Sequence, residues 1–135
     1  MSAKDVLKLM KSKNIEFVDL RFTDPRGKLQ HLTMDTTIVD EGMLNDGVFF
    51  DGSSIAGWKA INESDMILKP DLSRRVIDPY TSHNTLILFC DILDAVKRDP
   101  YERDPRGIAK KAEAYLKKTG IGDTAYFGPE PEFFA

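Results

Sequence analysis

The first part of the chain changes from a helical to a strand-like pattern of apolar residues. Over residues 2–13 apolar side chains recur at three- and four-residue intervals behind a capping serine, which predicts an amphipathic helix. From 18 to 23 apolar and polar residues alternate, as they do in a half-buried strand. Asp-Pro-Arg-Gly at 24–27 is typical of a turn, because proline presets φ and glycine tolerates positive φ. A second strand at about 28–34 is therefore expected to return antiparallel.

The next part of the chain predicts short elements on either side of a polar loop. Residues 39–45 have the pattern of a short helix, and 48–50 that of a short strand. The following stretch, 51–66, is too rich in glycine for a helix and too polar for a core strand, so we expect a surface loop.

Two apolar segments then indicate strands of different kinds. Residues 66–69 are strand-like, and Pro70 is expected to end that strand, leaving 70–84 irregular. The apolar run at 85–93, flanked by polar residues, predicts a core strand covered on both faces.

The last part of the chain predicts a linker, a capped helix and a strand. Residues 94–103 are polar and are expected to be a linker. Asp104 is placed to cap a helix that has Pro105 at its first position and closes at Gly120. A final strand is expected over 125–134. The order of elements predicts a small α+β domain followed by a second unit.

Composition and charge restrict the class of protein. The 135 residues are 41% apolar and 30% charged with a net charge of −3, which is typical of a globular protein and gives no electrostatic footprint for nucleic acid. The single cysteine, Cys90, excludes an intrachain disulfide. The longest apolar run, 86–90, is too short to span a membrane, and the charged N-terminus is unlike a signal peptide, so a cytoplasmic location is expected.

Two glutamates alternate with prolines near the C-terminus, in the sequence GPEPEFF. In a strand, Glu130 and Glu132 would share one face about 6.5–7 Å apart. Pro129 and Pro131 lack N–H groups, so such a strand would lie at an edge or be interrupted. Paired carboxylates suit Mg²⁺ or Mn²⁺, which can bridge to phosphate oxygens. Spacing alone equally allows an exposed face with two solvated glutamates.

The polar loop contains a second group of candidate residues. Asp51 and Ser54 flank Gly52 and Ser53, so a carboxylate and backbone N–H groups can face a ligand. Trp58, the only tryptophan, lies in the same loop, and Asp65 follows it. The alternative is a serine-rich turn whose tryptophan is anchored on its own domain.

Together these segments resemble the bacterial type I glutamine synthetases. The N-terminal signature of that family is similar to the residues at 50–54 and 63–65. Four longer segments resemble the family in the same order: FVDLRFTD at 17–24, INESDM at 61–66, YERDPRGIAKKAEAYL at 101–116 and GPEPEFF at 128–134. The resemblance covers essentially the whole chain.

The resemblance implies a fold and a division of the chain. Residues 1–13 would form an N-terminal helix, 14–98 a β-grasp domain, and 99–135 a linker with the first helix and strand of a catalytic domain. The remaining metal ligands, the nucleotide pocket and the substrate-binding arginines of the family would lie beyond residue 135, so the chain is expected to be inactive alone.

The resemblance also implies an activity and roles for particular residues. Members of the family make L-glutamine from L-glutamate, ammonia and ATP through a γ-glutamyl phosphate, with two Mg²⁺ or Mn²⁺ ions, in a dodecamer whose sites lie between subunits. Glu130 would bind the cation on the nucleotide phosphates and Glu132 the cation beside glutamate. Asp51 would hold ammonium and help to remove its proton. Ser54, Trp58 and Asp65 would belong to the surrounding loop at the subunit interface.

The sequence also allows two other interpretations, each a different class of protein. A freestanding β-grasp binding module would have no use for a capped helix and an acidic edge strand after its sheet. A minimal metal-binding protein would need more than two carboxylates.

Overall fold

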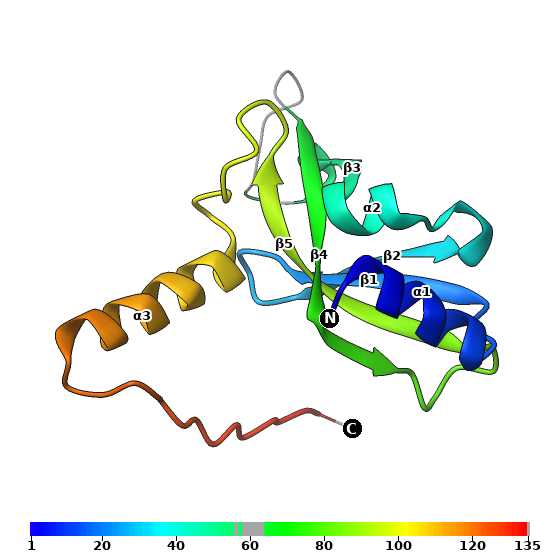
Figure 1. Cartoon of the computed structure of the whole chain (residues 1–135). Coiled ribbons are helices and arrows are strands. Elements are labelled where there is room, and N and C mark those ends of the chain that lie inside the picture. The colour runs from blue at the N-terminus through cyan, green and yellow to red at the C-terminus, as the bar shows by residue number, and fades with distance from the viewer. Residues whose placement is uncertain (56, 58–63, 135) are drawn as a thin grey trace.

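The computed structural model describes residues 1–55, 57 and 64–134 (Figure 1). A five-stranded sheet has the order β2-β1-β5-β4-β3. The central strand, β5, is parallel to its neighbour β1, and the other neighbouring pairs are antiparallel. A mixed sheet of this order with helices against it confirms the α+β, β-grasp fold class. The strands are β1 (Phe17–Thr23), β2 (Leu29–Asp35), β3 (Val48–Asp51), β4 (Asp65–Ile77) and β5 (Thr85–Asp94).

The first helix forms where the sequence predicts it. Helix α1 (Ala3–Ser12) begins with a capping box, in which the Ser2 hydroxyl accepts from the Asp5 N–H at 3.3 Å. The Asp5 carboxylate in turn accepts from the Ser2 N–H at 3.0 Å. Val6 and Met10 are buried against the sheet, so the apolar face of the helix covers the core.

The hairpin of β1 and β2 is also confirmed. Asp24 is buried in its turn, and its carboxylate accepts from the backbone N–H groups of Arg26 and Lys28, both at 2.9 Å. Gly27 has a φ of 84°, which glycine adopts without strain. The turn chemistry thus fixes the register of the two strands.

Helix α2 (Glu41–Asp46) lies between two short 3₁₀ turns, η1 (Thr36–Ile38) and η2 (Gly52–Ser54). It confirms the short helix expected at this position. Gly47 ends it with a φ of 86°, and a Cβ there would lie 2.5 Å from the carbonyl oxygen of Leu68. Only glycine allows the chain to turn so closely past β4 into β3.

The prediction that Pro70 ends a strand is wrong. β4 continues to Ile77 and pairs with β5 on both sides of a register shift between Pro70 and Arg75. Pro70 lies past Leu68, the last residue of β4 that pairs with β3, and at the start of the irregularity. Proline is tolerated in strands at edges and bulges, which is the position found here.

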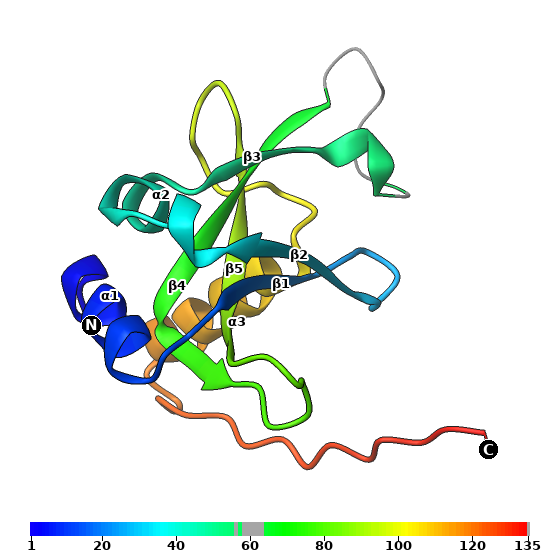
Figure 2. The same cartoon turned by 90° about the vertical axis from the view of Figure 1, so that its right-hand side faces the viewer.

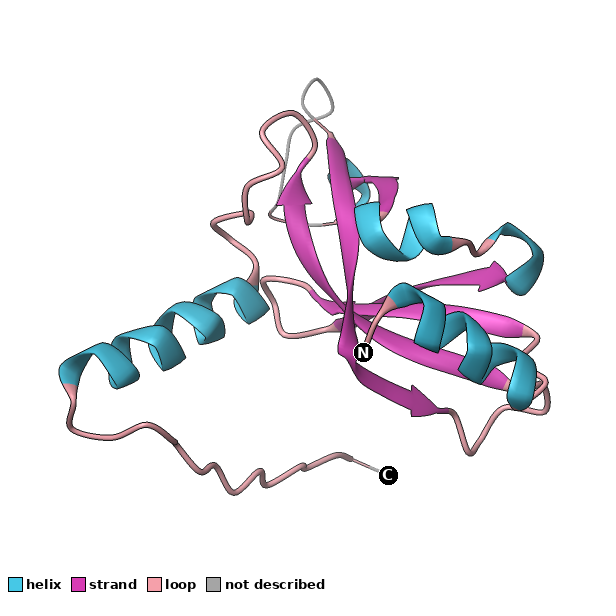
Figure 3. Cartoon of the chain, viewed as in Figure 1, coloured by secondary structure: helices cyan, strands magenta, loops and turns pink. Residues whose placement is uncertain are grey.

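Helix α3 (Pro105–Thr119) begins and ends at the predicted residues, with Asp104 as its N-cap and Gly120 in the left-handed region. The strand expected over 125–134 is wrong for this chain. Residues 124–134 have no helix or strand and are drawn as loop in Figure 3. A strand needs a partner, and prolines at 129 and 131 remove two of the donors that would bind one.

The core lies between the sheet and α1 and α2. Leu20, Leu44, Met66 and Leu88 are among its fully buried side chains, and the thiol of Cys90 lies there as well. Burial raises the pKa of the Cys90 thiol, so the group is held in its neutral form. Among the described residues, no helix has the length and apolar character needed to cross a membrane.

Candidate functional site

The carboxylate of Asp51 is held on a rigid turn. Asp51 is the last residue of β3 and caps η2. Its Oδ1 atom accepts from the N–H of Ser53 at 2.9 Å and from the Ser53 hydroxyl at 2.6 Å. These bonds from Ser53, with further hydroxyl bonds from Ser64 and Ser54, hold the pKa of Asp51 below its ordinary value. Asp51 is therefore an ionised, exposed carboxylate in a fixed direction.

Gly52 allows the turn to lie against the core. Its N–H donates to the carbonyl oxygen of Ser64 at 2.7 Å, and the residue is buried. A Cβ at this position would lie 2.3 Å from the sulfur of Met66. The glycine therefore brings the backbone beside Asp51 directly onto β4.

Asp65 is brought together with Asp51. The two residues are opposite each other in the register of β3 and β4, and both are exposed. Like charges at directly opposed positions repel, and a cation placed between or beside them would relieve the repulsion. Ser54 lies in the same turn and is exposed. Trp58 lies outside the described residues.

Glu130 and Glu132 are not brought to this turn. They lie on the exposed segment after α3. The C-terminal segment and the β3–β4 end of the sheet lie on opposite sides of the molecule in both views (Figures 1 and 2). Two glutamates are hard oxygen donors suited to Mg²⁺ or Mn²⁺, but six or more ligands are usual for such ions. Within the described part of the chain, no group of three or more His, Cys, Asp or Glu residues could hold a metal.

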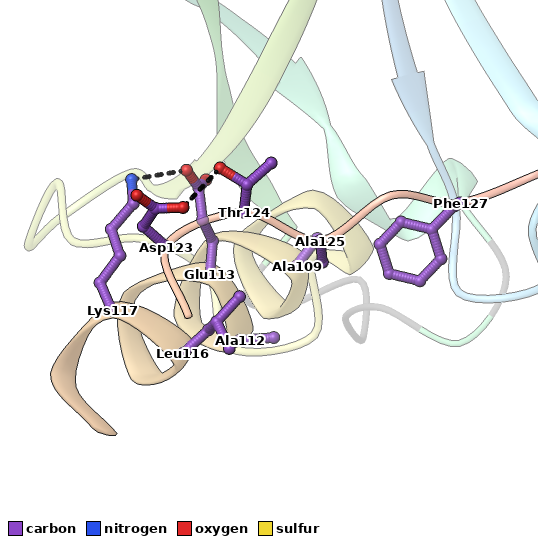
Figure 4. Close-up of a pocket in the computed structure, with 9 residues that line it drawn as sticks. All are labelled: Ala109, Ala112, Glu113, Leu116, Lys117, Asp123, Thr124, Ala125 and Phe127. Atoms are coloured by element: carbon purple, nitrogen blue, oxygen red, sulfur yellow. Dashed lines mark hydrogen bonds and ion pairs between the residues drawn. The ribbon is translucent and has the colours of Figure 1, made fainter. Parts of the chain in front are cut away.

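A hollow of about 760 Å³ lies between α3 and the segment that follows it (Figure 4). Its floor is formed by Ala109, Ala112 and Leu116 of the helix, and Phe127 approaches from the segment. At the rim, Lys117 donates to Glu113 at 2.8 Å. The hollow holds none of the predicted site residues.

A polar network around the buried Asp19 lies on the face of the sheet away from the core, and the sequence analysis does not predict it. Asp19 is only 3% exposed, and its carboxylate accepts from Arg21 at 2.7 Å, from Thr33 at 2.9 Å and pairs with His31 at 2.8 Å. Arg21 also donates to Asp78 at 2.9 Å. Burial raises the pKa of Asp19, but the bonds from Arg21, His31 and Thr33 outweigh it, and the net pKa is lowered. The alternation of β1 indicates that these side chains share a face, and nothing in it indicates burial.

Comparison with known families and proteins identifies the chain's relatives. Residues 14–95 match the family model of the glutamine synthetase β-grasp domain, and residues 102–135 match that of the glutamine synthetase catalytic domain. A glutamine synthetase of Rhizobium meliloti is 63% identical over 133 residues, which are 98% of this chain and 28% of that protein. A 3-hydroxylaminophenol mutase of Cupriavidus pinatubonensis is 55% identical over a similar span.

The fold agrees with a solved structure as well. The cryo-electron microscopy structure of Plasmodium falciparum glutamine synthetase matches with a TM-score of 0.81 and 26% identity, covering 91% of this chain and 24% of that one. The chain thus spans about a quarter of the length of the relatives it matches. The match of the β-grasp model to more than half of the residues establishes that this chain belongs to the glutamine synthetase family.

Proposed function

We propose that this chain forms the N-terminal part of a glutamate–ammonia ligase that makes L-glutamine from L-glutamate, ammonia and ATP. The observation that carries the proposal is the Asp51 turn. An ionised carboxylate, held by Ser53 and exposed beside Asp65, has the properties that binding of an ammonium ion requires, which supports the role that the resemblance implies for Asp51. Family membership supports the reaction class, with a γ-glutamyl phosphate as the activated intermediate.

In this proposal Asp51 binds ammonium and accepts the proton that ammonium loses. Ammonium has no lone pair, so it must lose a proton before its nitrogen can attack the γ-carbonyl carbon of the acyl phosphate. The C–N bond then forms, the C–O bond to phosphate breaks, and the phosphate leaves with the bonding electron pair and takes up the proton that the new amide nitrogen loses. A carboxylate with a lowered pKa is a strong partner for a cation and a weak base. Holding and orienting ammonium is therefore the main task of Asp51, with Asp65 adding negative charge nearby.

Glu130 and Glu132 would hold the two divalent cations, Mg²⁺ or Mn²⁺. When bound, such ions neutralise the charge of the transferring phosphoryl group, which is most of what phosphoryl transfer requires. Glu130 would serve the ion on the ATP phosphates and Glu132 the ion beside glutamate. Both side chains are exposed on an extended segment and are free to join ligands from elsewhere.

The separation of the two candidate groups favours a site shared between subunits. The Asp51 turn and the segment with Glu130 and Glu132 lie on opposite sides of this chain (Figures 1 and 2). In a ring of like subunits, as in a dodecamer, one subunit would present its Asp51 turn, with Ser54, Trp58 and Asp65, to the cations of its neighbour. We infer the division of the chain into 1–13, 14–98 and 99–135 and a cytoplasmic location on the same family grounds.

A chimera tests the proposal. The 135 residues would replace the corresponding N-terminal segment of the Rhizobium meliloti glutamine synthetase, which is 63% identical over 133 residues. We expect the chimera to form glutamine at a rate near that of the parent, and the 135-residue chain alone to form none. Asp51→Asn should lower kcat by about 10²–10⁴-fold. A folded chimera without ligase activity would contradict the proposal.

Asp46→Asn is the matched control. Asp46 is an exposed acid five positions before Asp51, and its carboxylate forms no hydrogen bond or ion pair with another described residue. Its substitution should leave kcat unchanged. Equal losses in the two variants would show that the effect of Asp51→Asn is one of general charge and not of the site.

A further inference from the structure

We propose that Arg106 is a positioning residue that fixes α3, and the chain that follows it, to the β-grasp sheet. The ion network formed by Arg106, Asp71, Asp91 and Lys110 is called the Arg106 clamp below. The clamp connects α3 to the sheet whether or not the protein has the proposed ligase activity. Its importance for the site rests on the proposed function, because the clamp lies between the sheet that bears Asp51 and the segment with the two glutamates.

The guanidinium of Arg106 joins two strands to one helix. Its Nε atom donates to Asp91 on β5 at 2.8 Å, and a terminal nitrogen donates to Asp71 on β4. Lys110, one turn further along α3, donates to the other oxygen of Asp91 at 2.5 Å. The network contains two carboxylates and two cations, so its charges balance. The planar fork of arginine can reach both carboxylates at once, whereas lysine carries a single point charge.

Partial burial makes this network stronger than an ordinary surface ion pair. The side chains of Arg106, Asp71 and Asp91 are 26%, 21% and 21% exposed. Solvent and salt screen such groups less than fully exposed ones. Burial raises the pKa of Asp71, but hydrogen bonds from Ser73 and the charges of Arg106 and Lys110 reverse the shift, so the carboxyl remains ionised.

The backbone before α3 is fastened to the same strand. The Ile92 N–H donates to the Asp104 carboxylate at 3.2 Å, and the Ile92 carbonyl accepts from the Tyr101 N–H at 2.8 Å. Asp104 is only 2% exposed and also caps the helix by accepting from the Arg106 N–H at 3.1 Å. Pro100 forms a bridge to Leu93. The segment expected to be a linker is thus pinned along β5 at several points.

Within the part of the chain that the structure describes, the rest of α3 is not buried against the sheet. The helix has no buried residue, and Ile108 and Tyr115 are 55% and 68% exposed. In Figure 1 the helix projects away from the sheet. The direction of all fifteen residues of α3 therefore depends on the contacts of its first two turns. Among the described contacts, Arg106 is the residue that joins the helix to two strands at once.

Distance measurement between two spin labels tests the clamp in the 135-residue chain. One label is placed at Lys8→Cys on α1, which is packed on the sheet, and the other at Lys118→Cys near the end of α3. Both positions are exposed, and Cys90 is buried and should not react. Double electron–electron resonance should give one narrow distance distribution for the native clamp. Arg106→Gln should broaden it at least about twofold, since α3 would swing about its cap.

Two further variants keep the test decisive. Arg106→Lys retains the charge but cannot bridge Asp71 and Asp91, so it should broaden the distribution as well. Lys111→Gln is the matched control, because the described residues show no ion pair for this exposed lysine of the same helix. Distributions for Arg106→Gln and Arg106→Lys as narrow as the native one, with unchanged circular dichroism, would overturn the proposal.

The consequence for the site is measured separately in the chimera. There Arg106→Gln should lower kcat by about 10- to 100-fold with Lys111→Gln unchanged, as a small misplacement of reacting groups does. Broadened distances with full activity would refute the positioning role and leave the mechanical clamp standing. An inactive chimera with native Arg106 would instead refute the proposed function, so the two failures are distinguishable.

Discussion

Replacing Gly52 by alanine is expected to lower the free energy of unfolding by about 1–2 kcal/mol. The added Cβ would lie 2.3 Å from the sulfur of Met66 and 2.9 Å from the carbonyl oxygen of Ser64. Met66 is fully buried, so its side chain cannot turn out into solvent. The Ser64 oxygen is held by its bond to the Gly52 N–H at 2.7 Å. Neither neighbour can yield without disturbing the core or the turn.

Two effects of opposite sign decide how much Gly52→Ala changes the free energy of unfolding. Overpacking a core of this kind costs about 1–3 kcal/mol. Gly52 does not have a positive φ, so alanine can adopt its backbone conformation. Because alanine also reduces the conformational entropy of the unfolded chain, it stabilises the folded state by about 0.4–1 kcal/mol. The steric cost of overpacking is larger than the entropic gain. We expect the turn that holds Asp51 to shift in order to accommodate the added methyl group.

Urea denaturation followed by far-ultraviolet circular dichroism measures the change. Gly128→Ala is the matched control: a Cβ there meets nothing within 4 Å, and the change should stay within about 0.5 kcal/mol. In a Met66→Val background, which lacks the sulfur, the cost of Gly52→Ala should shrink. The reasoning is refuted if Gly52→Ala is as stable as the native chain, or if its cost is the same in both backgrounds.

Two buried carboxylates give further predictions. Asp19→Asn should lower the free energy of unfolding by about 1–3 kcal/mol at neutral pH, because Arg21 and His31 lose their charged acceptor. Since the folded pKa of Asp19 is lowered, its stabilisation is present above the ordinary value of 3.8 and lost as pH falls through the folded value. Urea curves of both proteins should therefore converge in acid, and a constant gap would contradict the network. Asp104→Ala should leave the Ile92 N–H unpaired and cost about 1–3 kcal/mol. Hydrogen exchange at Ile92 should accelerate, and unchanged protection there would contradict the anchoring role.

Local chemistry predicts those elements whose ends are set by nearby residues. The hairpin of β1 and β2 follows from Asp24 and Gly27, which form its turn without help from the rest of the chain. Helix α3 follows from Asp104 and Gly120 for the same reason. These boundaries depend on backbone geometry and on hydrogen bonds between close neighbours in the sequence.

Features that depend on contacts between residues far apart in the sequence cannot be predicted from local sequence patterns. Pro70 has the local character of a strand terminator, but pairing with β5 resumes after the bulge and continues the strand. Asp19 alternates with apolar residues as a solvated side chain would, but it is buried once β1 lies between β2 and β5 and Arg21 joins it to Asp78. The stretch after Ala125 has strand-like residues without a partner strand in the described chain.

The candidate site also has one part that the local sequence predicts and one part that it does not. Asp51 and Asp65 can be placed together from the sequence once β3 and β4 are expected to flank one loop, and the register places them opposite each other. Ser53, which donates two hydrogen bonds to Asp51, is only two residues from it, so the fixed turn is largely a local feature. The position of Glu130 and Glu132 relative to that turn depends on α3 and its clamp, which the spacing of the two glutamates does not reveal.

Subunit complementation of the chimera tests most directly whether Asp51 acts with the cation ligands of a neighbouring subunit. Asp51→Asn and Glu132→Gln chimeras, each inactive alone, would be dissociated, mixed in equal amounts and reassembled. If each site takes Asp51 from one subunit and Glu132 from the next, about one quarter of the sites in a random assembly are intact. We predict that glutamine formation recovers towards one quarter of the native rate. Mixed assemblies that remain as inactive as the separate variants would contradict a site built between subunits.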